Sequence, residues 1–540
     1  MLFTPHEWSV LDGQDPQASG PVPGTATSPR PDNGHTITRR TITRRTSGGV
    51  ANNQNFLKGH PLDEPEGALQ GLYRRLSGPQ PDFRARAEGA ACLHRELELI
   101  EPLTACPTDG PTMPEDLHDW MQRNTQTAMD GYRAYLEGRK NGAARSYFTN
   151  RAHALYVLRA LAPTKLVDGA WLYGLLQYWE NPRYAELIRI YLQELGDGEA
   201  DKNHVALYRS LLARHGLEVN HGLPESFYLQ GTLQLALAWN AAEFLPEILG
   251  FNLGYEQLPL HLLITAYELN ELGIDPYYFS LHITVDNAQS GHAVRAVRAV
   301  QDALPRLRHD PVFWLRVQRG CRLSGAGQGT TDIIAGFDIA VEVARILAHK
   351  STTGRGAHSD YCLIDGRHVN EWLASPASIP AFLSALIDKG WIRLSEPAGN
   401  SRFWQLLQGP EAEMFGEFSP YELQVIHDWI RGPESADGKP YTEADSAVAA
   451  VKAPGTRATS RRASYKALKA LAQRRGIGVD ANQSLTAANV PPDADLDLLS
   501  STLPALGHHE QTQLLVHAMT PASHWTPAGL YATRLFAARL

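Results

Sequence analysis

The strongest constraint on the fold is a long stretch of helical patterning between residues 115 and 350. Strand-like alternation of apolar and polar residues is nearly absent there, and apolar residues recur at the three- and four-residue spacings of amphipathic helices. Asp275-Pro276 is typical of a helix start, because aspartate caps a helix and proline is tolerated at its first position. We therefore predict an all-α bundle over residues 115–350.

The flanking regions read differently. Residues 1–60 are rich in Pro, Gly, Ser and Thr and contain the duplication TITRRTITRRT, which predicts a disordered basic tail. Residues 61–114 are expected to form an N-terminal helical extension. Within 351–435 we predict a helix plus a β-hairpin, with the hairpin in WIRLSE and RFWQLL. Residues 436–540 are expected to be weakly structured, with short helices near the end.

Composition excludes several classes of protein. The chain has 50 Lys and Arg against 58 Asp and Glu, a net charge of −8, which argues against a surface built for nucleic acid. The four cysteines have no CxxC spacing, so we expect neither a disulfide scaffold nor a cysteine-rich zinc site, and a cytoplasmic location. We also expect no signal peptide and no membrane span, because no long apolar segment occurs.

Polar residues on apolar helix stripes are the candidates for chemistry. Glu194 shares a face with Tyr191 and Leu187, and a carboxylate facing a core needs a cation or hydrogen-bond partners. The alternative is an exposed glutamate at a helix end before Gly196. His204 follows a short Gly/Asp turn, so the ends of two adjacent helices can bring Glu194 and His204 to one point.

A second candidate group lies in YYFSLHITVDNAQSGHA. His282 and Asp286 are four residues apart and share a helix face, and imidazole with carboxylate is the donor set of non-haem iron sites. The alternative is a helical His–Asp hydrogen bond. His292 would point about 80° away from His282 on an ideal helix, so it reaches the same site only if the helix is distorted between Asn287 and His292.

Three further carboxylates lie in apolar surroundings. Asp168, in KLVDGAWLYGLL, is either a site residue or a helix N-cap before Gly169. Glu247 and Glu256 lie in FLPEILGFNLGYEQLPLHLL, and one or both are expected to face the bundle interior.

Four segments carry a resemblance to a known family: DGAWLYGLL, YLQELGDGEADKNHVALYRSLL, LPEILGFNLGYE and YYFSLHITVDNAQSGHA. Together they resemble the iron-containing redox enzyme family, which comprises haem-oxygenase-like diiron oxidases, over about residues 145 to 350. The resemblance implies a helical bundle that binds two Fe(II) ions and activates O2. It also implies oxidation of a small molecule, often an amino acid or fatty acid in natural-product biosynthesis.

Carried over residue by residue, the resemblance implies a set of metal ligands: Asp168, Glu194, His204, Glu247, His282 and Asp286. Two features depart from the family pattern. Asp168 stands where glutamate is more common, and the family's His-x3-Asp-x2-His run is here His-x3-Asp-x5-His, so that Gln289 takes the histidine position. Either His292 completes the site through a distorted helix or one iron is bound more weakly. Tyr191, Tyr208 and Tyr278 are expected to donate hydrogen bonds around the site.

Two other functions are compatible with the sequence. A haem-degrading oxygenase would use His153 as the proximal ligand, and a non-enzymatic helical adaptor would not bring Glu194, His204, His282 and Asp286 together. For the iron oxidase we expect a small-molecule substrate, O2 and an external reductant as partners, without membrane or nucleic acid.

Overall fold

The computed structural model describes residues 67–100, 110–111, 113–219, 222–285, 291–306, 310–354, 356, 358, 361–408, 412–432 and 493–540. The fold is all-α, as predicted, since the only strands among these residues are the two-residue β1 and β2. No helix in this part of the chain combines the length and apolar character needed to cross a membrane. The predicted basic tail of residues 1–60 lies outside the described residues.

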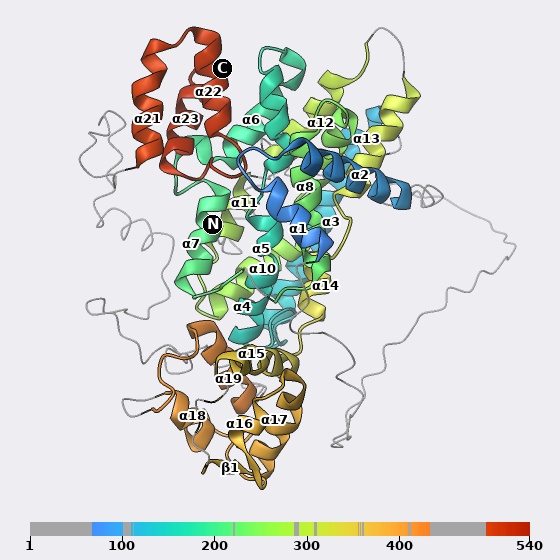
Figure 1. Ribbon diagram of the computed structural model, residues 1–540. Helices are drawn as coiled ribbons and strands as arrows, with labels where there is room; N and C mark the ends of the chain where they lie inside the picture. The colour runs from blue at the N-terminus through green and yellow to red at the C-terminus, as the bar shows by residue number, and fades with distance from the viewer. Residues whose placement is uncertain are drawn as a thin grey trace, which may run out of the picture. The chain divides into compact units, whose positions relative to one another are not determined.

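The first half of the fold comprises helices (α) and short 3-10 helices (η), shown in Figure 1. Their bounds are α1 (Ala68–Leu76), α2 (Phe83–Ile100), η3 (Pro114–Asp116), α3 (Leu117–Lys140), α4 (Arg151–Ala160), α5 (Ala162–Lys165), η4 (Ala170–Tyr178), η5 (Pro182–Tyr184), α6 (Ala185–Glu194), η6 (Gly196–Gly198), α7 (His204–Arg214), η7 (Glu225–Tyr228), α8 (Leu229–Trp239), α9 (Leu245–Tyr255) and α10 (Leu260–Glu271).

The second half continues with α11 (Tyr277–Val285), α12 (His292–Ala303), α13 (Pro311–Leu323), α14 (Thr330–Ala335), α15 (Ile339–Gly354), β1 (Leu363–Ile364), β2 (Arg367–His368), α16 (Val369–Trp372), η8 (Pro376–Ser378), α17 (Ile379–Asp388), η9 (Ala398–Asn400), α18 (Arg402–Leu407), α19 (Pro420–Arg431), α21 (Ala494–Thr502), η11 (Leu503–Ala505), α22 (His508–Ala518) and α23 (Pro527–Ala537). Helices α1 and α2 both pack on α8, which ties the N-terminal extension to the bundle.

The bundle core consists of two clusters of buried side chains that adjoin near Asp168. One cluster includes Tyr208 and Tyr278, and the other includes Trp171 and Tyr191. The Tyr278 hydroxyl of the first cluster donates a hydrogen bond to Asp168 Oδ2 at 2.6 Å, and Val167, which precedes Asp168, belongs to the second cluster. Burial of these apolar surfaces is the main source of stability for the bundle.

Helices α9 and α13 cross at unusually close range. A Cβ atom at Gly250 would lie 1.8 Å from the Val317 carbonyl oxygen, and one at Gly320 would lie 2.1 Å from the Glu247 carbonyl oxygen. Both distances are far below van der Waals contact, so only glycine permits the two backbones to approach this closely. The crossing fixes the position of α9, whose end leads to Glu256.

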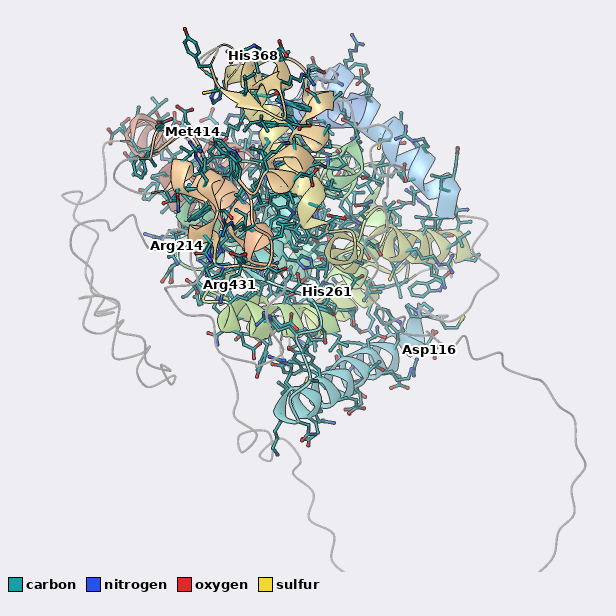
Figure 2. The ribbon with its side chains drawn as sticks, turned by 90° about the horizontal axis from the view of Figure 1, so that it is seen from below. Asp116, Arg214, His261, His368, Met414 and Arg431 are labelled. Atoms are coloured by element: carbon teal, nitrogen blue, oxygen red, sulfur yellow. The ribbon has the colours of Figure 1, made fainter. Side chains whose placement is uncertain are left out.

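The predicted hairpin does not form where we expected it. RFWQLL is the helix α18, and WIRLSE contains no strand. A short antiparallel hairpin instead pairs β1 with β2, and Figure 2 labels His368 at its end. The physical reason is that Phe403 and Leu407 of α18 are buried at a four-residue spacing, which fits a helix rather than a strand.

The last part of the chain is more ordered than expected. Residues 433–492 lie outside the described residues, but residues 493–540 form α21, α22 and α23, which pack on one another (Figure 1). Leu515, Met519 and Phe536 are fully buried in the same cluster as Trp171. These contacts join segments far apart in the sequence, which local composition does not reveal.

Candidate metal centre

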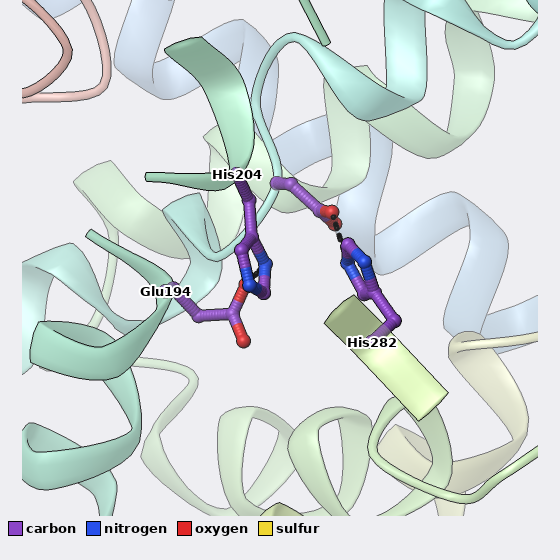
Figure 3. A group of neighbouring side chains, drawn as sticks. Glu194, His204 and His282 are labelled. Atoms are coloured by element: carbon purple, nitrogen blue, oxygen red, sulfur yellow. Dashed lines mark hydrogen bonds and ion pairs between the residues drawn. The ribbon is translucent and has the colours of Figure 1, made fainter. Parts of the chain in front are cut away.

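Four acidic and histidine side chains from separate parts of the bundle meet at one buried point. Asp168, Glu194, His204 and His282 each offer one ligand atom, and these atoms all lie within 4.8 Å of one another. Figure 3 shows Glu194, His204 and His282 pointing toward this point. The imidazole rings of His204 and His282 lie only 4.1 Å apart between their centres. The structure thus brings together four of the residues that the sequence singled out.

Asp168 reaches the cluster from the turn before η4. Gly169, rather than Asp168, is the N-cap residue, and its φ of 78° is left-handed. A Cβ at Gly169 would lie 2.9 Å from Glu194 Cβ, so glycine allows the turn to approach α6. Asp168 Oδ2 lies 3.1 Å from His282 Nε2, while Oδ1 is 3.6 Å from Lys165 Nζ.

Glu194 and His204 lie on either side of the η6 turn. Glu194 is the last residue of α6 and is 3% exposed, which excludes the alternative of a solvated glutamate. His204 is the first residue of α7, where the Asn203 side chain caps the helix by accepting from the Ala206 amide. Glu194 Oε2 lies 2.5 Å from His204 Nδ1.

A second group shares Glu194 with the first. Glu194, Glu256 and His292 also offer ligand atoms within 4.8 Å of one another. His292 Nδ1 lies 3.1 Å from Glu194 Oε1 and 3.2 Å from Glu256 Oε2. Each oxygen of the Glu194 carboxylate therefore faces a different group.

The irregularity expected before His292 is seen at Gly291, the one residue of 287–291 that the structure describes. Helix α11, which carries His282, ends at Val285, and His292 begins a new helix, α12, after Gly291 in extended conformation. His292 therefore approaches Glu194 from its own helix rather than from a continuation of α11. Asp286 and Gln289 lie outside the described residues, so their predicted roles stay predictions.

Glu247, which we predicted as a ligand, is not part of either group. Its carboxylate accepts from Arg316 Nε and Nη2, both at 2.6 Å. The reason is helix geometry: Glu247 and Glu256 are nine residues apart, which corresponds to about 180° around a helix, so they face opposite sides. Glu256 is the carboxylate that α9 directs to the site.

We expect Glu247→Gln to leave iron binding unchanged and to lower the free energy of unfolding. The loss should be about 1–2 kcal/mol, because Arg316 loses its buried partner but is itself a third exposed and can be hydrated. Metal analysis and urea denaturation of the purified variant test both expectations. Loss of iron from this variant would return Glu247 to the candidate ligands.

The three tyrosines differ in their relation to the site. Tyr278 is the donor to Asp168, and Tyr208 packs edge-on against Tyr278 while its hydroxyl donates to the Leu158 carbonyl. The Tyr191 hydroxyl donates to the Met519 carbonyl and not to a site residue. Only Tyr278 therefore makes the hydrogen bond that we expected of all three.

Lys165 is a site neighbour that sequence reasoning missed. It is one helical turn before Asp168, a spacing that would have signalled the pairing. Burial would raise the pKa of Asp168, but the Lys165 ammonium and His282 hold that pKa below its usual range. Lys165 Nζ also lies 3.3 Å from the Tyr255 hydroxyl.

The electrostatics of the metal-free site are those of coupled acid–base pairs. Burial would raise the pKa of Glu194, yet His204 and His292 hold it well below its usual range. Burial would lower the pKa of His204, but the Glu194 carboxylate raises it. Without a metal, the imidazole groups therefore stabilise the charged carboxylates. A bound cation would stabilise the same carboxylates more strongly and would leave the imidazoles neutral.

The residues present fit a metal ion. Three carboxylates and three imidazoles converge in the two groups, and all six residues are buried. Among the described residues, buried Asp168 Oδ1 accepts no hydrogen bond and lies 3.6 Å from the Lys165 ammonium. A set of carboxylates and imidazoles suits iron, whereas Ca²⁺ and Mg²⁺ prefer sites built from oxygen ligands alone.

His153 is not arranged as a haem ligand. Its Nδ1 lies 3.3 Å from the Thr149 amide nitrogen, which donates to it, and its Nε2 lies 2.9 Å from the Ile334 carbonyl oxygen. The ring also stacks on Phe337 with 4.5 Å between centres. Both ring nitrogens are engaged, so His153 is a core residue in this arrangement.

The buried His153 predicts a pH dependence of stability. Burial lowers the pKa of its imidazole to about 4, below the value of about 6.5 in an unfolded chain. The unfolded chain therefore binds more protons between these values, and the free energy of unfolding falls as the pH drops from about 6.5 to about 4, by up to about 3 kcal/mol. Urea denaturation of metal-free protein should show a flatter pH dependence for His153→Gln. The exposed His118→Gln is the control, and equal slopes in both variants would contradict the prediction.

Comparison with known proteins points to the same segment of the chain. Residues 155–325 match the family model described as "Iron-containing redox enzyme". Neither the search of curated proteins nor the search of solved structures found a match. The matched segment contains all six residues of the two groups. The adaptor hypothesis predicts that Glu194, His204 and His282 do not converge, whereas the structure brings them together. Residues 155–325, with their all-α fold and a buried carboxylate–histidine cluster compatible with iron, are therefore similar to the iron-containing redox enzyme family.

Proposed function

We propose that this chain is a non-haem diiron oxidase that uses O2 to oxidise a small molecule. The observation that carries the proposal is the sharing of Glu194 between two buried carboxylate–histidine groups. Asp168, His204 and His282 would complete one metal position, and Glu256 and His292 the other. When bound in these positions, ferrous ions supply the electrons that reduce O2.

The protein residues would fix the charge and geometry of this centre. Tyr278 holds one oxygen of Asp168 by its hydrogen bond, and Lys165 faces the other. With neutral imidazoles, the three carboxylates and the Lys165 ammonium leave two negative charges, which one divalent cation balances. A second cation would require further anionic ligands, and Asp286 or an acidic substrate would meet this need. This charge balance supports weaker binding at the second position.

The apolar surroundings of the site support a role in excluding water. Tyr278, which donates to Asp168, and Tyr208, which packs on Tyr278, are buried, and so are all six residues of the two groups. A dry site strengthens the electrostatic interactions of its charged groups and limits side reactions. From the family resemblance we extend the proposal to an amino-acid- or fatty-acid-like substrate in specialised metabolism, an external reductant and a cytoplasmic location.

Anaerobic titration with Fe(II) tests the metal centre directly. Protein purified without oxygen should bind close to two Fe(II) per chain, with the second more weakly, and should show no Soret absorption band. Binding of haem, or no binding of Fe(II), would overturn the proposal.

O2 consumption tests the reaction. The iron-loaded protein should consume O2 faster when an oxidisable substrate from a panel of amino acids and fatty acids is added. Glu247→Gln is the matched control, because it removes a buried carboxylate of the same bundle that faces away from the site. Equal O2 consumption with and without iron would contradict an iron-dependent oxidase.

A further inference from the structure

The last helices of the chain lie against the turn that joins Glu194 to His204. We call residues 493–540, with α21, α22 and α23, the C-terminal arm. Helix α23 packs on η6, where Arg534 Nε donates to the Gly198 carbonyl at 3.0 Å. A Cβ at Gly198 would lie 2.4 Å from the Leu530 carbonyl oxygen, so the arm and the turn are in direct backbone contact. The arm is outside the segment that matches the family model.

Asn203 connects the arm to both site residues. Its side chain is completely buried, and its Oδ1 caps α7 by accepting from the Ala206 amide at 2.9 Å. Its Nδ2 lies 3.2 Å from the Leu195 carbonyl oxygen and 3.2 Å from His524 Nδ1. Leu195 directly follows Glu194, and Asn203 directly precedes His204, so one amide group ties together the backbone of both.

His524 is the arm's contribution to this contact. It is 1% exposed, and burial, together with the charge of Arg209, lowers the pKa of its imidazole to about 3. The ring is therefore neutral at ordinary pH, and Nδ1 can accept the hydrogen bond from the Asn203 amide. The arm makes two more contacts with the helices of the site: the Met519 carbonyl accepts from Tyr191 of α6, and the Trp525 ring lies 3.8 Å from the Arg209 guanidinium of α7.

We infer that Asn203 and His524 are positioning residues through which the C-terminal arm holds Glu194 and His204 in their ligating arrangement. The C-terminal arm thus supports the geometry of the metal centre, although it lies outside the segment that contains the candidate ligands. This inference rests on the proposed function, because it assigns the arm a role in the same metal site. Removal of hydrogen bonds that orient metal ligands commonly lowers metal affinity 10- to 100-fold.

The test compares two disruptive variants with one conservative variant. His524→Leu removes the Nδ1 acceptor and leaves only the longer contact, 3.4 Å, from Asn203 Nδ2 to the residue 524 carbonyl oxygen. Asn203→Ser keeps an oxygen that can cap α7 but loses the amide donor. His524→Asn places an amide oxygen near the position of Nδ1 and should restore the hydrogen bond. Glu247→Gln serves as the control for a general loss of stability.

Two measurements distinguish positioning from mere folding. We expect His524→Leu and Asn203→Ser to bind Fe(II) about 10-fold more weakly than the parent. We also expect them to change the ligand-field absorption of bound Co(II) while keeping the parent's far-UV circular dichroism. His524→Asn should return both signals toward those of the parent. Unchanged affinity and spectrum in the disruptive variants, or changes no larger than in Glu247→Gln, would overturn the inference. A parent protein that binds no Fe(II) would instead overturn the proposed function, and this inference with it.

Discussion

Replacing Glu194 by alanine is expected to abolish most iron binding, from about two ions per chain to well below one. Glu194 is the only residue that belongs to both candidate groups, so its loss removes a carboxylate from each. Glu194 is also the carboxylate that His204 and His292 contact, at 2.5 and 3.1 Å, so the substitution removes negative charge between the two histidines. Anaerobic metal analysis after Fe(II) loading and desalting measures the effect.

The control for this experiment is Glu247→Gln, which we expect to retain iron. Glu194→Gln is a second useful variant, since it keeps the side-chain volume but removes the charge. Retention of two irons by Glu194→Ala would show that the two groups do not form a shared centre. Far-UV circular dichroism of Glu194→Ala should match that of the parent, which shows that a loss of iron does not result from unfolding.

Trp171→Ala is expected to lower the free energy of unfolding by about 3–5 kcal/mol, the largest stability effect of a single change that we predict. Trp171 is 1% exposed and contacts the rings of Phe251 and Tyr255. Its Nε1 donates to Asn252 Oδ1 at 3.0 Å, so truncation leaves both a cavity and an unsatisfied amide oxygen. Urea denaturation of the metal-free protein measures the change.

Trp171→Phe separates the two contributions. It retains most of the apolar contact but loses the indole donor, and we expect a loss of about 1–2 kcal/mol. A loss in Trp171→Ala no larger than in Trp171→Phe would show that the cavity collapses and that packing here is less tight than the structure indicates.

The residues that the sequence predicted best were those with a strong local signal. Glu194, His204 and His282 are polar residues on apolar helix faces, and such residues are buried only when they have partners. The helical character of residues 115–350 follows from periodicity alone, and the glycine before His292 marked the break between α11 and α12. Local patterns indicated these helices and polar positions, whereas the ligand set came from the family resemblance and stays a prediction.

The errors arose where local patterns do not determine the outcome. Choosing Glu247 over Glu256 ignored their half-turn separation, which the sequence contains but which matters only once the facing helix is known. The contact of the C-terminal arm with the η6 turn joins residues more than 300 positions apart, as between Asn203 and His524. Chain entropy opposes such long-range contacts, and only the complementarity of the folded surfaces selects them.

The close crossing of α9 and α13 determines how the position of Glu256 could change during evolution. Gly250 and Gly320 leave no layer of side chains between the two backbones, so α9 is held by direct main-chain contact. A single methyl group added at Gly250 would push α9 away from α13 and shift Glu256, whereas Asp168, His204 and His282 come from other elements. A substitution at Gly250, which belongs to neither candidate group, would thus move Glu256 relative to the group of Asp168, His204 and His282 without altering any candidate ligand.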